Sequence, residues 1–269
     1  MWVLFTTFAA RSHLKARVPL ACPLRATTCT GASQPDLIDV HEVPPSPTRR
    51  QPTTMLERRM SPTMQYRKLA VAGAVEFTPQ VFTDDRGIFV SPFQVDAFAE
   101  AVGHPMFPVA QTNHSRSRRG VVRGAHFTLT PPGICKYVYC ARGRTIDFVI
   151  DVRVGSPTFG RFDSVLLDQQ SFRAIYFPVG VAHAFVALED DTVVSYMLSE
   201  AYVVAHEKVV SVLDPALNLP LPQDLELLMS ERDSNAPTVD EVRRAGLLPD
   251  YAQCQKLERA LHETRVGQL

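Results

Sequence analysis

Short runs of alternating apolar and polar residues dominate the chain from about residue 66 to residue 221. The clearest run is Thr145–Val152, in which Ile146 and every second residue after it are apolar, while Asp147 falls on the other side. Successive side chains of a strand point to opposite faces, so this run predicts a β-strand. Further strands are predicted over residues 121–127, 136–140, 162–167, 174–177, 184–188 and 192–198. Short strands separated by turn residues predict an antiparallel sandwich or a small barrel.

The pattern becomes helical towards the end of the chain. Thr238–Glu241 has the residues of a capping box, and Gly246 is a suitable stop for the helix that it begins. After Pro249 the apolar residues recur at helical spacing, at Tyr251, Cys254, Leu257 and Leu261. We therefore predict one domain over residues 65–269, with a β core to about residue 222 and a cap of short helices over residues 223–269.

Residues 1–64 differ from the rest of the chain. They contain eight of the 21 prolines, and the first acidic residue is Asp36. An acid-poor start resembles an organelle transit peptide, but the closely spaced Met55, Met60 and Met64 favour a simpler interpretation. We predict a disordered leader or an over-extended start site, with the folded part beginning at Met64.

Charge and cysteine content narrow the possible functions. The 28 basic and 28 acidic side chains leave no net charge to attract a nucleic acid. No apolar run approaches the roughly 18 residues that a membrane span requires. The five cysteines form no Cys-x-x-Cys pair, which favours reduced thiols in a cytoplasmic protein.

Two glycine-containing blocks each carry one histidine, His126 and His183. The second block, Pro178-x-Gly180-x-x-His183, resembles a motif of the cupins, so the strands predict a cupin-like double-stranded β-helix, or jelly roll. A metal-binding cupin also needs a His-x-His pair and a carboxylate in its first motif, and only His126 is present there. We therefore expect no metal at these histidines, and proton transfer by them instead.

Six separated blocks stand out along the chain: Phe82–Phe89, Gln111–Ser115, Val122–Phe127, Gly155–Gly160, Pro178–Phe185 and Asp214–Ala216. Together with Lys136 they resemble the dTDP-4-dehydrorhamnose 3,5-epimerase family, in the family's order and spacing. The resemblance covers about residues 66–233. It implies a dTDP-4-keto-6-deoxyhexose substrate, inversion at C3, C5 or both, no cofactor, and a homodimer.

The same resemblance implies catalytic roles. A ketone acidifies its neighbouring C–H bonds, so an epimerase needs a base, an acid on the opposite face and a donor at the enolate oxygen. His126 matches the family's base and Asp233 the aspartate that holds it. Tyr196 matches the acid, and Lys136 aligns with the lysine near the C4 oxygen.

Substrate binding is predicted from charge and shape. Arg86 and Arg123 can clamp a diphosphate through forked hydrogen bonds. His183 is expected to hold the sugar, with Asp147 as its partner. The remaining candidates are Gln111 and Asn113, for the phosphate, sugar or base, and Phe82 and Phe89, for the thymine ring.

Two positions depart from the family pattern. Ser91 stands where many members have an acidic residue, and Met197 replaces a lysine that often follows the tyrosine. Two alternatives therefore stay open: a cupin-type ketoisomerase of dTDP-sugars, and a non-catalytic barrel that binds sugar nucleotides. These positions also do not separate enzymes that invert C3 alone, C5 alone or both.

Overall fold

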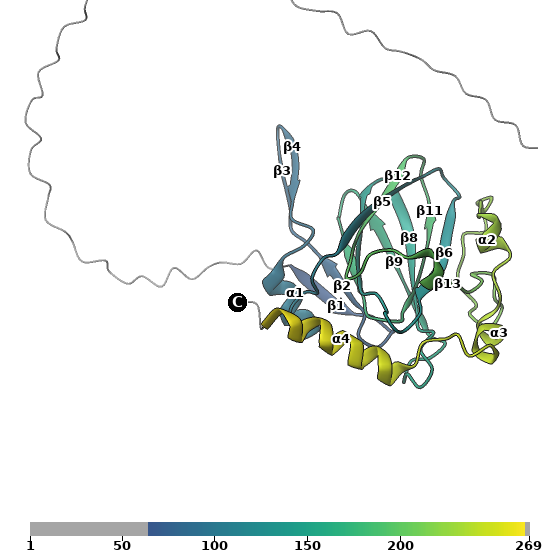
Figure 1. Ribbon diagram of the computed structural model, residues 1–269. Helices are drawn as coiled ribbons and strands as arrows, with labels where there is room; N and C mark the ends of the chain where they lie inside the picture. The colour runs from purple at the N-terminus through teal and green to yellow at the C-terminus, as the bar shows by residue number, and fades with distance from the viewer. Residues whose placement is uncertain (1–63, 267–269) are drawn as a thin grey trace, which may run out of the picture. The chain divides into compact units, whose positions relative to one another are not determined.

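Two antiparallel sheets form the core of the protein (Figure 1). The computed structural model describes residues 64–266. The larger sheet has the order β1 (Gln65–Lys68), β2 (Val75–Thr78), β10 (Ala174–Phe177), β7 (Lys136–Arg142), β12 (Thr192–Leu198), β5 (Gln111–Ser117). The smaller has the order β13 (Glu207–Val209), β6 (Val122–Thr128), β11 (Ala182–Ala187), β8 (Arg144–Ile150), β9 (Phe162–Asp168).

The space between the sheets is filled from both sides. Val138 and Ile175 of the larger sheet belong to one buried cluster with Val149, Val165 and other residues of the smaller sheet. Side chains that face each other from two sheets are the core of a sandwich. This arrangement confirms the predicted all-β, cupin-like jelly-roll core.

Each sheet is covered on its outer face as well. Helices α1 (Val95–Val102) and α4 (Tyr251–Val266) lie along the larger sheet, where Phe98 and Leu257 pack on Tyr137 and Tyr176. Segment 210–248, which contains α2 (Glu231–Ser234) and α3 (Val239–Arg244), covers the smaller sheet around Phe148. None of the helices in residues 64–266 has the length and hydropathy of a membrane span.

All seven strands predicted from alternation are present, and their ends differ from the predicted ones by a few residues. The predicted capping box at Thr238 is confirmed, since its side chain accepts from the backbone N–H of Glu241 while the Glu241 carboxylate accepts from the backbone N–H of Thr238. The predicted stripe is confirmed for Cys254, Leu257 and Leu261, which pack in the cluster on the larger sheet, whereas Tyr251 is outside this cluster and stacks on Arg153. Apart from Met64, the predicted leader lies outside the described residues.

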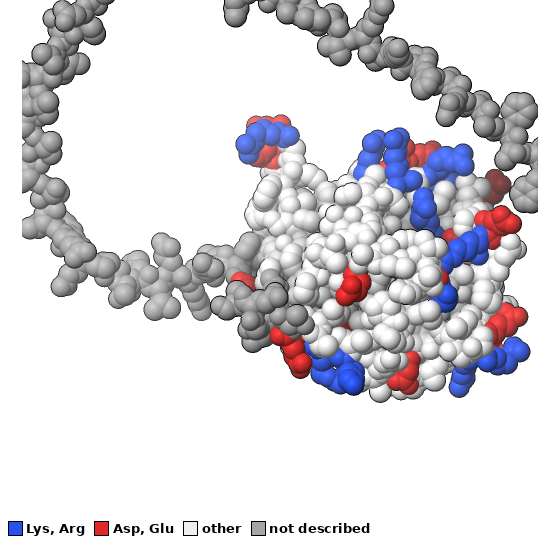
Figure 2. Space-filling view, viewed as in Figure 1, with Lys and Arg blue, Asp and Glu red and all other residues white. Residues whose placement is uncertain are grey.

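Several elements were not predicted. They are the short strands β1 and β2, β5, β13, α1, the 3-10 turn η1 (Val204–His206), and a hairpin of β3 (Val81–Asp84) and β4 (Gly87–Val90). The hairpin projects from the sandwich, and charged residues gather at its tip (Figures 1 and 2). Most of its residues are exposed, so it lacks the buried face that produces a clear alternation of apolar and polar positions.

A buried ion pair fixes the turn of the Gly155–Gly160 block. The guanidinium of Arg153 donates to both oxygens of Asp151, at 2.9 and 2.8 Å, and the two side chains are 2% and 0% exposed. The hydroxyls of Ser156 and Thr158 donate to the same carboxylate. Burial alone would raise the pKa of Asp151, but these donors outweigh it and lower the pKa.

Replacing one partner of this pair should be costly, because it leaves the other charge buried without a counterion. We expect Asp151→Asn to lower the free energy of unfolding by ~3–5 kcal/mol, measured by urea denaturation. Asp240→Asn is the control, since it removes an exposed ion pair with Arg244 on α3 and should cost far less. Equal losses in the two variants would contradict a structural role for the buried pair.

Candidate active site

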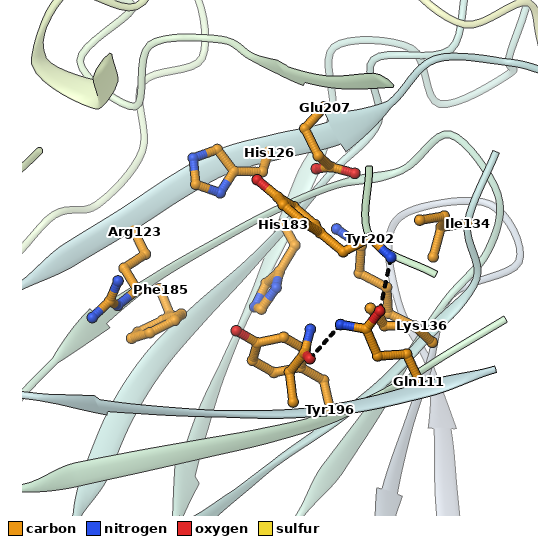
Figure 3. Close-up of a pocket in the computed structure, with 12 residues that line it drawn as sticks. Gln111, Arg123, His126, Ile134, Lys136, His183, Phe185, Tyr196, Tyr202 and Glu207 are labelled. Atoms are coloured by element: carbon orange, nitrogen blue, oxygen red, sulfur yellow. Dashed lines mark hydrogen bonds between the residues drawn. The ribbon is translucent and has the colours of Figure 1, made fainter. Parts of the chain in front are cut away.

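A cavity of about 360 Å³ opens between the two sheets (Figure 3). Seven of the residues predicted for the site line it: Gln111, Asn113, Arg123, His126, Lys136, His183 and Tyr196. They come from five strands of both sheets, β5, β6, β7, β11 and β12. Residues of three of the separated sequence blocks, together with Lys136 and Tyr196, therefore meet in one place.

Strand pairing brings the two histidines together. His126 of β6 and His183 of β11 are direct partners in the antiparallel register, so their side chains leave the sheet on the same face. Gly124 allows this close approach, since a Cβ at its position would lie 2.5 Å from the carbonyl oxygen of His183. The glycine beside the first histidine is thus required by the packing of β6 against β11.

His126 is held by Asp233. Its Nε2 lies 2.7 Å from the Asp233 carboxylate, which is buried at the start of the short helix α2. Burial alone would raise the pKa of Asp233, but hydrogen bonding and charge from His126 lower it. An ionised carboxylate accepts the Nε2 proton, so the lone pair of neutral His126 is on Nδ1.

His183 forms a second pair of this kind with Asp147. The distance from its Nε2 to the carboxylate is 2.7 Å, and Asp147 is fully buried. The hydroxyl of Thr145 also donates to Asp147. Burial lowers the pKa of His183 in spite of this carboxylate, so the ring is neutral at physiological pH.

Tyr196 and Lys136 face the histidines from the larger sheet. Tyr196 lies on β12 and Lys136 on the neighbouring β7, whereas His126 and His183 lie on the smaller sheet (Figure 3). Burial raises the pKa of Tyr196, so its phenol holds its proton. Burial lowers the pKa of Lys136, which the charge of Glu207 partly offsets. The cavity therefore has a proton acceptor on one wall and a proton donor on the other.

The polar residues at the cavity edge are held in place by hydrogen bonds to one another and to neighbouring groups. The Gln111 amide donates to Asn113 at 2.7 Å and accepts from the backbone N–H of Tyr202 at 2.9 Å (Figure 3). Arg123 donates to the hydroxyl of Ser117 at 3.2 Å. These contacts leave the Arg123 guanidinium on the lining of the cavity, where it can meet an anion.

Three predicted residues are not brought into the cavity of the chain that carries them. Phe82, Arg86 and Phe89 lie on the projecting β3–β4 hairpin. The two rings are 46% and 69% exposed, and Arg86 is paired with Asp84 at 2.6 Å. In a single chain they therefore do not reach the residues on the cavity wall.

Five lining residues were not predicted as part of the site: Ile134, Phe185, Leu198, Tyr202 and Glu207. Glu207 is buried and accepts a hydrogen bond from Thr128. It follows the irregular segment around η1, where no alternation indicates that it points inward. Phe185 does lie in the second histidine block, and its place in that block is the one feature of the sequence that could have predicted its position at the site.

Comparison with known proteins agrees with this geometry. The family model described as dTDP-4-dehydrorhamnose 3,5-epimerase matches residues 68–241. This chain belongs to that family. The match confirms the resemblance seen in the sequence blocks, and it covers the whole cavity together with Asp233.

The matches to individual family members extend over nearly the full length of each member. A dTDP-4-dehydrorhamnose 3,5-epimerase of Mycolicibacterium smegmatis is 45% identical over 204 residues, which are 76% of this chain and 100% of the relative. The structure of NovW, a 4-keto-6-deoxy sugar epimerase from the novobiocin cluster of Streptomyces spheroides, matches at 46% identity and a TM-score of 0.69, over 71% of this chain and 96% of that chain.

A third member was solved with a bound sugar nucleotide. ChmJ, a 3′-monoepimerase from Streptomyces bikiniensis in complex with dTDP-quinovose, is 43% identical with a TM-score of 0.69. The match covers 72% of this chain and 98% of that chain. The family members similar to this chain thus include both double and single epimerases.

Neutral, buried His183 should make stability depend on pH. Its folded pKa is below the ordinary 6.5, so just below pH 6.5 the unfolded chain binds more protons than the folded protein does. The free energy of unfolding therefore falls as the pH drops through this range, by up to ~1.4 kcal/mol per pH unit for one group. His183→Asn should have a shallower slope, measured by urea unfolding between about pH 5 and 7. An unchanged slope would contradict a neutral His183.

Proposed function

We propose that the protein epimerises a dTDP-4-keto-6-deoxyhexose at C3, C5 or both. The observation that carries the proposal is the placement of His126 and Tyr196 on opposing sheets across one cavity. Inversion of a carbon requires removal of its proton from one face and its return to the other. A cavity with a base on one wall and an acid on the other meets this requirement.

His126 removes the proton α to the ketone in this proposal. Asp233 orients the ring and stabilises the imidazolium that forms, because the carboxylate is ionised and lies 2.7 Å from Nε2. The proton is then taken by Nδ1, which carries the lone pair. A base of this kind contributes a factor of roughly 10²–10⁴ to the rate.

Lys136 and His183 act on the oxygen side of the sugar. The negative charge of the carbanion moves to the C4 oxygen, where a buried cation or donor stabilises it strongly. The charged form of Lys136 is the candidate for this role, and His183, fixed by Asp147, is a neighbouring donor or acceptor for the sugar. Tyr196 then donates its proton to the opposite face of the enolate.

Incubation with the 4-keto sugar nucleotide in deuterated water tests the proposal. We expect deuterium to enter C3, C5 or both, with the position read by proton NMR, because the proton delivered to the carbon comes from a tyrosine hydroxyl that exchanges with solvent and not from the sugar. The cupin-type ketoisomerase instead predicts a carbonyl at a new carbon. The non-catalytic barrel predicts binding without exchange, and either of these results would reject the proposal.

Two variants in the same experiment distinguish the residue that removes the proton from the residue that returns it to the opposite face of the sugar. His126→Ala should abolish both exchange and inversion, whereas Tyr196→Phe should impair inversion more than exchange, because its base is intact. The label in C3 and C5 also decides between single and double epimerisation. Equal losses of exchange and inversion in both variants would contradict the separate roles.

The nucleotide part of the substrate is assigned to the polar end of the cavity. Arg123 is proposed to bind the diphosphate, and Gln111 and Asn113 to contact the phosphate, sugar or base. These assignments are supported by the position of all three residues on the lining of one cavity and, for Arg123, by its positive charge. Met197 and Ser91, the two departures from the family pattern, both lie on an adjoining groove that shares Asn113 and Tyr196 with the cavity.

We further propose a homodimer in which the hairpin of one chain completes the site of the other. Phe82, Ile88 and Phe89 are large apolar residues left exposed on the hairpin, and such exposure is typical of an interaction surface. Much of the surface beside the hairpin in Figure 2 carries no charged side chains. Arg86 would then reach the diphosphate, and Phe82 and Phe89 the thymine, in the partner's cavity.

Mixing two inactive variants tests this assembly. Arg86→Ala and Tyr196→Phe damage different parts of the site, and in a mixed dimer one site carries both changes while the other carries neither. After exchange of subunits the mixture should recover about a quarter of the wild-type activity, as expected for random pairing in a twofold dimer. Light scattering checks the dimer, and no recovery in mixed dimers would reject hairpin exchange.

A cytoplasmic location is the remaining proposal. Cys135, Cys140 and Cys254 are free and buried, and free thiols are typical of proteins in a reducing compartment. The other two cysteines lie outside the described residues.

A further inference from the structure

A second cluster of titratable side chains lies far from the cavity, where α4 packs against the segment after α1. The ligand atoms of His104, Glu258 and His262 all lie within 4.8 Å of one another. Glu258 and His262 are four residues apart on α4 and so project from the same face of the helix. His104 comes directly after Gly103, at which α1 ends.

His262 is an unusual histidine for a protein interior. Its side chain is buried, and neither ring nitrogen has a hydrogen-bond partner among the described residues. Its ring stacks on that of His104, with centroids 3.6 Å apart and an angle of 27° between the planes. Burial, assisted by His104, lowers the pKa of His262 to about 4. Buried polar atoms without a partner are rare, and a bound metal ion is one explanation for them.

The side chains of His104 and Glu258 are oriented by further hydrogen bonds. Nδ1 of His104 lies 3.0 Å from the carbonyl oxygen of Pro105, to which it donates, and this leaves Nε2 facing Glu258 at 3.6 Å. The hydroxyl of Tyr176, from the middle of β10, donates to the Glu258 carboxylate at 2.5 Å. Metal-binding histidines usually donate their second N–H to a carbonyl or carboxylate in this way, and ligating carboxylates are hydrogen-bonded too.

We propose that His104, Glu258 and His262 form a binding site for a divalent transition metal ion, with Zn²⁺ as the first candidate. Two imidazole nitrogens and one carboxylate are a ligand set that Zn²⁺ accepts with a fourth, open position. Mg²⁺ and Ca²⁺ prefer oxygen ligands, so they do not suit this set.

The surroundings provide room for the fourth ligand. A groove of about 190 Å³ borders all three residues and is also lined by Tyr251 and Arg153. A water molecule or a small anion could therefore complete the coordination.

The metal would join α4 to the rest of the fold. The apolar residues of α4 cover the outer face of the larger sheet, whereas His126 and His183 face the space between the sheets. The proposed metal site therefore has no part in the proton transfer, and it does not depend on the proposed function. Its role would be to hold the C-terminal helix in place.

Cobalt binding tests the site directly. The tag-free, full-length protein is treated with EDTA, dialysed and titrated with Co²⁺, whose visible absorption reports tetrahedral coordination. We expect one Co²⁺ per chain, displaced by Zn²⁺ and not by Mg²⁺. A hundredfold excess of Zn²⁺ over its Kd should also raise the Tm by roughly 5–10 °C.

Matched variants locate the ion. Glu258→Gln and His104→Phe, which keeps a ring to stack on His262, should each lower Zn²⁺ affinity by at least roughly tenfold. Glu263→Gln makes the same charge change at an exposed position of α4 and should bind as the wild type does. His126→Asn should also retain binding.

The melting curve in EDTA shows whether each variant is folded before its affinity is compared. Absence of tetrahedral Co²⁺ bands in the wild type would reject the proposal. So would equal Zn²⁺ affinity in His104→Phe and wild-type protein, or loss of binding in His126→Asn.

Discussion

The cavity depends on the burial of two carboxylates against two imidazoles. A carboxylate removed from water is costly unless it is paired and hydrogen-bonded, and Asp147 and Asp233 each meet a histidine nitrogen at 2.7 Å. Each pair fixes the orientation of its ring and the nitrogen that carries the proton. Since both rings leave neighbouring strands in register, one packing requirement positions the proposed base and its neighbour together.

The strand with Asp147 shows how polar chemistry enters the fold. The apolar side of β8, with Phe148 and Ile150, faces the C-terminal segment that covers the sheet. The side with Asp147 and Val149 faces the space between the sheets. Near the site, the face of β8 that points between the sheets is thus the more polar one. Its outer, apolar face is shielded from water by the C-terminal segment. Because both faces of this sheet are buried, many of its residues are apolar.

The central strands were predictable from the sequence because their buried residues read as short, mostly apolar runs between turn residues, and α4 because one apolar stripe of the helix is buried. The resemblance of the sequence blocks to the epimerase family identified seven residues on the cavity wall, from Gln111 to Tyr196. The β3–β4 hairpin gave no such signal, since its side chains meet solvent in one chain. Tyr202 and Glu207 were missed for a related reason: Tyr202 lies in the irregular segment between β12 and β13, and Glu207 directly follows it, and the direction of this segment depends on tertiary contacts. In the proposed dimer the position of Phe82 and Arg86 depends on assembly, which alternation along one chain does not encode.

The two aspartates have different origins along the chain. Asp147 lies within the sheet that carries His183, 36 residues before it, whereas Asp233 follows His126 by 107 residues. During synthesis the strands of the sandwich emerge before residue 233, but a domain generally folds as a unit. Docking of the segment that covers the apolar face of the smaller sheet is therefore also the step that brings Asp233 to His126. The proposed base becomes competent only after the covering segment has been made and has docked, which links the onset of chemistry to completion of the fold.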